Sequence, residues 1–479
     1  MYGRTFASIV VLFWGLPAHA QELRVVLDDT FASDPQIRIA RANTEQTQAS
    51  LDLARTEGRP RLSLTTYASI ETVDPQSFYS RKGGRFGAGI DADVPIFSGG
   101  EIRYRIRSAR YVRDESLATL DETINARKAL AAERYADLIR DIAVVGSNAD
   151  QLADMAATLN ASVERRRHGD LTDTDIHQAA ARLATSQASL ARARSALTQS
   201  QEGVREITGE YVRDASWPET PSVDGDVADL ARRLVDAPAL RAADARIAGA
   251  RAVVDIQRSQ RLPRLSLTGG IKRANDLDDG QSIAARRFRW STSVGLTLGI
   301  PLFRGGAITA RVRQAEAFVS ANQWQRAAIE RDLTSTIRAR YSQLQAAERR
   351  AEALSSAVDA AKRAAYGVGL ESKEGWRTVL DILNARSEIT QNEIALASAR
   401  SEKVALAYSI LSLMGRIPTT VAREITPVTF KRAAPTERVI RIASTPAQIK
   451  YPVDALGLWT WQGSTTWSLA PGSHSAGKA

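Results

Sequence analysis

The feature that most constrains this sequence is a motif that occurs twice, because it indicates that the chain is an internal duplication. VPIFSGG at residues 94–100 returns as IPLFRGG at residues 300–306. Residues 34–64 also align without gaps with residues 237–267, so that RPRLSL is matched by LPRLSL. The offset changes once, from 203 to 206, between the RLSL and PxF segments, where we expect an exposed loop. A repeat of this length is too long for a solenoid and implies two similar structural halves.

The first twenty residues have the pattern of a secretory signal. Arg4 precedes an apolar run at residues 6–16, and Ala18-His19-Ala20 makes a cleavage site. We therefore expect residues 1–20 to be removed and the mature chain to be exported. No later stretch approaches the roughly 18 apolar residues that a membrane helix needs, so any membrane crossing would require strands.

Each half contains two segments with the two-residue period of a β-strand. In the clearest one, Ile90 and Val94 belong to an apolar face, and Asp91 and Asp93 belong to a polar face. Each segment has about the nine to eleven residues that cross a bilayer at a tilt, although an amphipathic hairpin over a soluble core has the same pattern. Four strands cannot close a barrel and open edges do not survive in lipid, so closure would require several chains. The predicted strands are residues 61–70, 86–97, 264–272 and 289–302.

Long proline-free tracts follow each PxF-x-GG turn and predict unusually long helices. Proline is absent from residues 96–217 and again from residues 302–417, which are rich in Ala, Arg, Glu, Leu and Gln. A helix over residues 101–167 would be on the order of 100 Å long. A shorter helix before the strands and the returning helix could together flank this long helix, so that the helices form one wall. The predicted helices after the turns are residues 101–167, 172–209, 307–372 and 377–415.

These elements predict the domain organisation of the chain. The first repeat covers residues 21–212 and the second covers residues 227–417, with a Pro- and Gly-containing linker at 213–226. The tail at 418–479 contains several prolines and is expected to be extended or disordered. Each repeat therefore has a helix, two strands, a long helix and a returning helix.

Two kinds of turn connect these elements and are the first candidate sites. The strand-to-helix turns contain Pro95, Gly99, Gly100, Pro301, Gly305 and Gly306. The turns between the long and the returning helices contain Gly169, Thr172, Asp175, Gly375 and Thr378. Glycine allows the chain to reverse, and Thr172, Asp173 or Thr378 can cap the next helix.

Composition excludes most enzymatic functions. The chain has no cysteine, and only His168 and His177 lie outside the signal and the tail. Their spacing, even with Asp170, Asp173 and Asp175 nearby, matches no common metal-ligand pattern. No phosphate-binding glycine loop or GxSxG motif is present, so we expect no catalytic residues, metal or cofactor. The formal charge of +10 is spread among acidic residues on helices, which argues against nucleic-acid binding.

Residues 22–417 resemble the TolC-like outer-membrane efflux and secretion channels of Gram-negative bacteria. The resemblance is carried by the duplication, by PxF-x-GG after a strand, by LPRLSL before one, and by GWRTVLDILNAR at residues 375–386. It implies a mainly helical homotrimer with a small β part. Four strands per chain would form a 12-stranded β-barrel in the outer membrane, and the helices would form a long periplasmic tunnel.

The resemblance also implies a gate at the second helical turn. Arg377 matches an arginine that helps hold the tunnel entrance closed, and Asp381 matches the first of two acidic residues at the narrowest point. The second acidic position is Asn384 here, which halves the expected charge of the ring. The family's gating tyrosine is replaced by Ser372. We expect an iris-like opening of the second-half helix pair and a preference for cations at Asp381.

The partners follow from the same resemblance. A periplasmic adaptor, also called a membrane fusion protein, would contact the helical tips, and an inner-membrane ABC or proton-driven transporter would supply energy. Outer-membrane lipid would surround the strands. The GxRTVLDxLNA run favours type I protein secretion, with small-molecule efflux also open. The alternative from a different class is a soluble periplasmic adaptor or structural protein built from helical hairpins.

Overall fold

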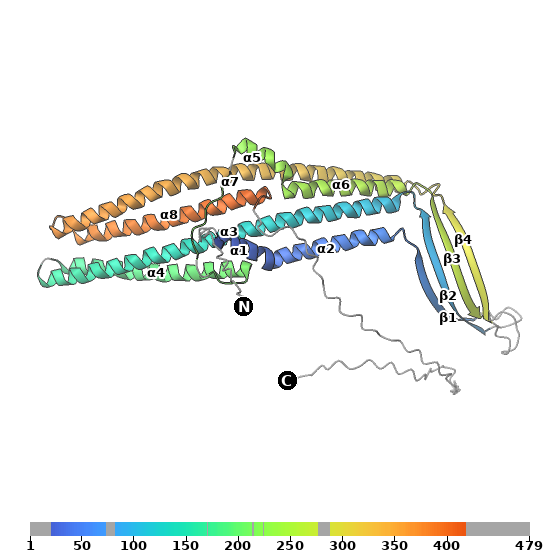
Figure 1. Ribbon diagram of the computed structural model, residues 1–479, viewed down its shortest axis with the longest axis horizontal. Coiled ribbons are helices and arrows are strands. Elements are labelled where there is room, and N and C mark those ends of the chain that lie inside the picture. Colours follow the sequence, from blue (N-terminus) through green and yellow to red (C-terminus); the bar gives the residue numbers. More distant parts are fainter. Residues whose placement is uncertain are drawn as a thin grey trace, which may run out of the picture. The chain divides into compact units, whose positions relative to one another are not determined.

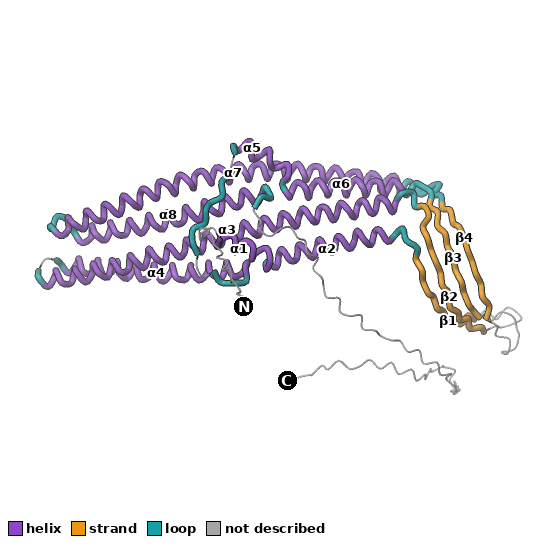
Figure 2. Tube along the Cα trace, in the orientation of Figure 1, coloured by secondary structure: helices purple, strands orange, loops and turns teal. Residues whose placement is uncertain are grey.

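The computed structural model describes residues 21–72, 82–169, 171–212, 215–223, 225–275 and 288–417. The expected signal peptide at 1–20 and the tail at 418–479 lie outside these residues. The described part is mainly helical and contains one four-stranded antiparallel sheet (Figures 1 and 2). This is the fold class that the sequence predicts.

The helices and strands follow each other in the same order in both halves. The first half contains α1 (Gln21–Ser33), α2 (Pro35–Thr56), β1 (Arg61–Thr72), β2 (Lys82–Phe97), α3 (Glu101–Arg167) and α4 (Asp173–Thr208). The second half contains α5 (Val227–Arg233), η2 (Leu234–Asp236), α6 (Pro238–Ser259), β3 (Arg264–Asn275), β4 (Phe288–Gly299), α7 (Ala307–Lys373) and α8 (Val379–Leu413).

Several bounds differ from the predicted ones, each for a local reason. Strand β4 ends at Gly299 and not at 302, because Pro301 has no N–H group to donate to a neighbouring strand. The predicted helices 172–209 and 377–415 included their capping residues, which lie outside α4 and α8. Strands β1, β2 and β3 each continue further toward the strand-connecting loops than predicted. Those loops, residues 73–81 and 276–287, lie outside the described part of the chain.

Helix α1 and its counterpart, α5 with η2, were not predicted from the sequence. At the offset of 203 residues, Leu27 of α1 corresponds to Leu230 of α5, and both side chains are buried. Leu27 belongs to a buried apolar cluster with residues of α3, α4 and α8, and Leu230 belongs to one with residues of α6, α7 and α8. These helices are short, and tertiary packing stabilises them more than their local sequence does. The duplication therefore extends further toward the N-terminus than residues 34–64.

The long helix α3 lies at the centre of a layer of helices. It contacts α2 and α4 on one side and α6 and α8 on the other, and α7 contacts α6 and α8 (Figure 1). Helices α2 and α4 therefore share one flank of α3 along its length, as do α6 and α8 on the opposite flank. The layer ends with α2 and α4 at one edge and with α7 at the other.

The sheet repeats the order of the helices to which it is connected. Its order is β1-β2-β3-β4, and each neighbouring pair is antiparallel. Leu64, Ile90, Ile271 and Leu296 belong to one face, because the register pairs Leu64 with Ile90, Ile90 with Ile271, and Leu267 with Leu296. This apolar face is exposed, and Val294 on it is 79% accessible. Strands β1 and β4 form the two open edges of the sheet.

Candidate functional site: the helical tips and the strand-to-helix turns

The two helical tips are built by the same glycine and the same capping box. Gly169 and Gly375 have φ angles of 88° and 81°, in the left-handed region that favours glycine. The Thr172 hydroxyl accepts from the Asp175 N–H at 3.3 Å, and the Thr172 N–H donates to Asp175 Oδ2 at 3.0 Å. These bonds satisfy N–H groups at the start of α4 that have no partner within the helix. The predicted cap at Thr172 is thus present.

The second tip repeats this box with the predicted gate residue Asp381. Its carboxylate accepts from the Thr378 N–H at 2.9 Å and from the Thr378 hydroxyl at 2.8 Å. These hydrogen bonds, together with the charge of Arg377, hold the pKa of Asp381 below its usual value. The side chain is therefore charged at neutral pH. It is also part of the helix cap, a role that the sequence analysis assigned to the threonine alone.

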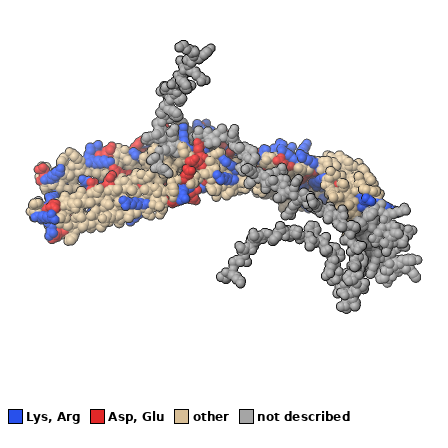
Figure 3. Space-filling view, turned by 60° about the horizontal axis from the view of Figure 1, so that its bottom comes forward, with Lys and Arg blue, Asp and Glu red and all other residues tan. Residues whose placement is uncertain are grey.

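The predicted gate arginine is exposed and pairs within its own tip. Arg377 Nε donates to Glu371 Oε2 at 2.7 Å, and this hydrogen bond is the main cause that raises the pKa of Arg377. Trp376 beside it is 79% exposed, whereas Ser372, at the position of the family's tyrosine, is buried. Acidic and basic side chains lie close together at the tips in Figure 3, so these ends do not carry a charge of one sign.

Asn384 connects the two tips. Its Oδ1 accepts a hydrogen bond from Arg182 Nη2 of α4 at 3.4 Å. A small apolar cluster lies beside this contact and joins α3, α4 and α8. The buried members of this cluster are Met155, Ala179, Val379 and Leu383.

Polar contacts between α3 and α8 continue above the tips, and the sequence analysis did not predict them. Arg386 forms an ion pair with Asp154, and Gln151 Nε2 donates to Ser387 Oγ at 3.3 Å. Further from the tips, Ser147 Oγ donates to Glu393 Oε2 at 2.9 Å. These contacts tie the helix pair α7 and α8 to α3 of the same chain.

The strand-to-helix turns also repeat. Gly99 and Gly305 have φ angles of 63° and 57°, and Gly100 and Gly306 are the N-caps of α3 and α7 with φ angles of 82° and 79°. The environments differ, however. A Cβ atom on Gly99 would lie 2.7 Å from Leu262 Cβ, whereas one on Gly305 would meet nothing within 4 Å.

The two prolines of these turns lie in different positions. Pro95 is inside β2 next to a register shift, and Pro301 follows β4. Nearby, Glu101 at the first position of α3 is buried and forms ion pairs with Arg105 and with Arg264 at the start of β3. The junction of helix and strand in the first half is therefore tied to the second half.

Two further observations limit the kinds of site on this chain. Within the described residues, no three His, Cys, Asp or Glu side chains are grouped so that they could hold a metal ion, and His168 and His177 are exposed. Asp170, considered with them, lies outside these residues. No helix in the described ranges has the length and apolar character to span a membrane.

Comparison with known proteins identifies several relatives. The sequence model of the family described as outer membrane efflux protein matches residues 26–210 and 230–416. The outer membrane efflux protein BepC of Brucella suis is 25% identical over 418 residues, covering 84% of this chain and 87% of that protein. The outer membrane protein TolC of Vibrio cholerae is 25% identical over 419 residues, covering 85% and 93%. The solved Campylobacter jejuni CmeC outer membrane channel has the same fold, with a TM-score of 0.73 at 14% identity over 88% of this chain and 95% of that one.

Proposed function

This chain belongs to the outer membrane efflux protein family, and on that premise we propose that three copies of it form the exit duct of a tripartite export system. Family membership makes it an outer-membrane channel protein and not an enzyme, as the sequence predicted. The finer steps of its mechanism, its partners and its cargo are parts of this proposal.

The single observation that carries the proposal is that the sheet and the helix layer are open at corresponding edges. Strands β1 and β4 are the edges of the sheet, and they connect directly to α2 and α7, which are edge helices of the layer. The exposed apolar face of the sheet suits lipid, but its unpaired edges do not. Further copies of the chain would satisfy both edges at once, with twelve strands in a trimer. This arrangement gives no support to a soluble helical adaptor.

The tip of the second half is the proposed gate. An iris-like outward movement of α7 and α8 around Arg377 would widen the entrance. In the described structure this pair is held to the first half by Arg386 with Asp154 and by Arg182 with Asn384. Opening would have to break these contacts, because they join the moving pair to α3 and α4. Side-chain contacts of this exposed kind are weak enough to exchange.

Asp381 is the proposed source of cation preference at the gate. Its carboxylate remains charged at neutral pH because Thr378 donates two hydrogen bonds to it. We expect Asp381→Ala to reduce cation over anion selectivity in planar-bilayer recordings. Asp175→Ala is the matched control, since it removes the same capping box from the first tip. An equal loss in both variants would assign the effect to the cap and not to charge at the pore.

The proposed partners act at the tips and at the strands. A periplasmic adaptor would contact the turns at Gly169, Thr172 and Asp175 and at Gly375 and Thr378, which are exposed or half-buried. An inner-membrane ABC or proton-driven transporter would supply the energy. The cargo class proposed is protein by type I secretion, small molecules by efflux, or both.

Membrane fractionation followed by gel migration with and without boiling tests the duct. We expect the protein in the outer membrane, running as a trimer before boiling and as a monomer afterwards. A monomer in unboiled outer membranes would contradict the trimeric duct. Recovery of the mature chain in the soluble periplasmic fraction would contradict the channel as a whole.

A further inference from the structure

We propose that α7 and β4 of one copy contact α2, α4 and β1 of the next copy in the register that the chain already uses between its own halves. This inference rests on the proposed trimer. It adds which residues face each other at each interface between copies, which we call a seam. Another copy of this chain therefore pairs with each open edge, and the internal duplication determines its register.

The two halves are equivalent at the level of single contacts. Arg105 Nη1 lies 3.4 Å from Glu57 Oε1 between α3 and α2. The corresponding Arg311 Nη1 lies 3.1 Å from Gln260 Oε1 between α7 and α6. The offsets are 206 residues for the arginines and 203 for their partners, as in the sequence alignment. Helix α7 thus has the same relation to α6 that α3 has to α2.

The sheet obeys the same two offsets. Leu64 pairs with Ile90 in the first hairpin, and the corresponding Leu267 pairs with Leu296 in the second. The three-residue difference between the halves is therefore confined to the strand-connecting loops. Helices and strands thus follow the same two offsets. The seam at which β2 and α3 contact β3 and α6 is therefore a template for the seam at which β4 and α7 contact β1 and α2 of the next copy.

The described residues of α3 and α6 form three ion pairs at this template seam, which join Arg107 to Asp255, Glu115 to Arg246 and Asp121 to Arg241. Applying the offsets keeps opposite charges only at the first of these, the pair nearest the sheet. Arg107 Nη1 of α3 lies 3.9 Å from Asp255 Oδ2 of α6. The corresponding residues are Arg313 on α7 and Asp52 on α2, and both are exposed in the single chain. Both charges are retained in the transposed positions. Arg313 of one copy therefore faces Asp52 of the next.

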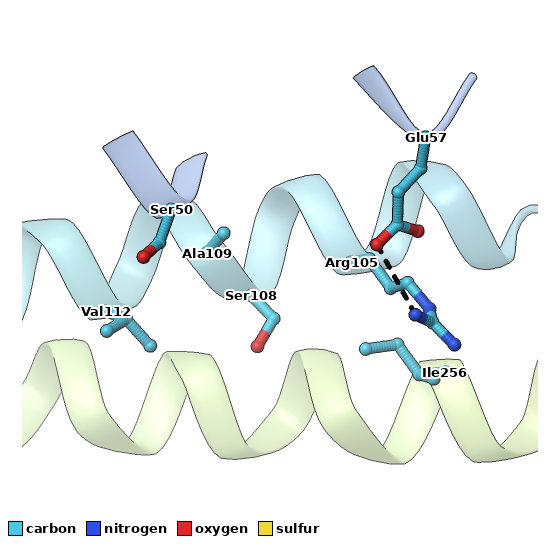
Figure 4. A pocket seen from close by; sticks show the side chains of 7 residues that line it. All are labelled: Ser50, Glu57, Arg105, Ser108, Ala109, Val112 and Ile256. Atoms are coloured by element: carbon cyan, nitrogen blue, oxygen red, sulfur yellow. Dashed lines mark hydrogen bonds and ion pairs between the residues drawn. The ribbon is translucent and has the colours of Figure 1, made fainter. Parts of the chain in front are cut away.

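The apolar residues next to this pair also correspond. An open pocket of about 310 Å³ between α2, α3 and α6 has Val112 and Ile256 in its lining (Figure 4). Their counterparts are Phe318 and Leu53, which are 57% and 68% exposed in the single chain. In the transposed register Phe318 and Leu53 line the same seam, at opposite ends of the corresponding pocket. The larger Phe318 fills space that the smaller valine leaves open within the chain.

The strand register follows in the same way. Ala92 of β2 is paired with Gly269 of β3. The corresponding residues are Leu298 of β4 and Thr66 of β1, so these two are directly opposite when β4 meets β1 of the next copy. This pair lies on the apolar face of both strands.

Near the tips the template predicts a seam of a different character. The intrachain contacts of Asp154 with Arg386 and of Gln151 with Ser387 join α3 to α8. Their counterparts between copies are alanines on both sides. The transposed pairs are Ala360 with Ala180, and Ala357 with Ala181. The seam between copies therefore allows close helix approach at the tips and carries its charge pair near the sheet.

Cysteine cross-linking in outer membranes tests this register, since the natural chain has no cysteine. Directly opposite residues in an antiparallel sheet have Cα atoms within the separation that a disulfide spans. We expect full-length Thr66→Cys/Leu298→Cys protein to shift mostly to a cross-linked band on oxidation. Thr66→Cys/Leu296→Cys is the matched control, displaced by two residues on the same face, and it should remain mostly uncross-linked.

The outcomes separate this register from the trimer itself. Preferential cross-linking of the displaced pair, or no cross-linking of either pair in a protein that runs as a trimer, overturns the register and leaves the duct standing. A monomer on unboiled gels for the unsubstituted protein overturns the duct. As a second test, Asp52→Arg should lower the temperature at which the trimer dissociates, and adding Arg313→Asp should restore it. Absence of restoration would contradict the charge pair.

Discussion

The ion pair between Asp154 and Arg386 gives the sharpest test of how the tip opens. It joins α3 to α8 of one chain, next to the hydrogen bond between Gln151 and Ser387. If α7 and α8 move outward as proposed, this pair must break in every copy. Replacing Asp154 with alanine removes the attraction in the closed state and leaves the open state unchanged. The variant should therefore be open more often.

The size of the effect follows from the exposure of the pair. The side chains of Arg386 and Asp154 are 40% and 42% exposed, so solvent screens the attraction. Exposed pairs of this kind contribute about 0.5 kcal/mol each, and three copies together about 1.5 kcal/mol. Since about 1.4 kcal/mol changes an equilibrium tenfold, we expect roughly a tenfold rise in the ratio of open to closed channels. The pair is too exposed to justify a larger estimate.

Planar-bilayer conductance of the purified variant measures this ratio. Asp150→Ala is the matched control, because it removes an exposed carboxylate from the same helix about one turn away and no contact from Asp150 to α8 is seen among the described residues. The charge exchange Asp154→Arg/Arg386→Asp should return the conductance toward the original value. If Asp154→Ala conducts like the control while remaining a trimer, α7 and α8 do not separate from α3. The tip would then open at the alanine seams between copies.

Further substitutions test the local structure. Thr378→Ala removes one half of the capping box and should cost about 1 kcal/mol, measured as faster amide exchange at the start of α8. Gly99→Ala and Gly305→Ala should both lower the thermal unfolding temperature of the trimer, because a Cβ atom on Gly99 would lie 2.7 Å from Leu262 Cβ and Gly305 faces the corresponding Arg59 of the next copy in the proposed register. The lowered pKa of Asp381 stabilises the folded tip above the ordinary aspartate pKa of about 4, and this stability is lost as pH falls through the folded value. The protection factors of amides at the start of α8, corrected for the pH dependence of intrinsic exchange, should therefore fall in acid, and a flat profile would contradict the role of the carboxylate.

The long helices and the sheet were predictable because their signals are local and repeated. A proline-free tract such as residues 101–167 favours a helix at every position, and the alternation around Ile90 identifies one apolar face of a strand. The turn at Gly375 was predictable for the same reason, since glycine next to a threonine cap is a short pattern. In each case the duplication supplied a second, independent example of the same element.

The contacts between distant elements were not predictable from local patterns. Asp154 and Arg386 are separated by more than two hundred residues, and only the packing of α8 against α3 brings them together. Helix α1 was missed because its burial against α3, α4 and α8 stabilises it more than its own sequence does. One signal could have indicated the polar contacts, namely that Asp154 and Arg386 correspond to alanines in the other half. A charge that appears in only one copy of a repeat points to a contact made by only one copy.

The duplication relates two seams, the one between the halves of the chain and the one proposed between copies, and the requirements on the two differ. The seam inside the chain joins elements that are already covalently connected, so polar contacts such as that of Asp154 with Arg386 can specify it at little entropic cost. The proposed seam between copies must form between separate molecules, and an error of one residue in strand register would turn the apolar face away from lipid. Register is therefore best specified at the sheet and at the adjacent pair of Arg313 with Asp52. The alanines near the tips then allow close approach of the helices without fixing the tips, which are the part that the proposed gate has to move.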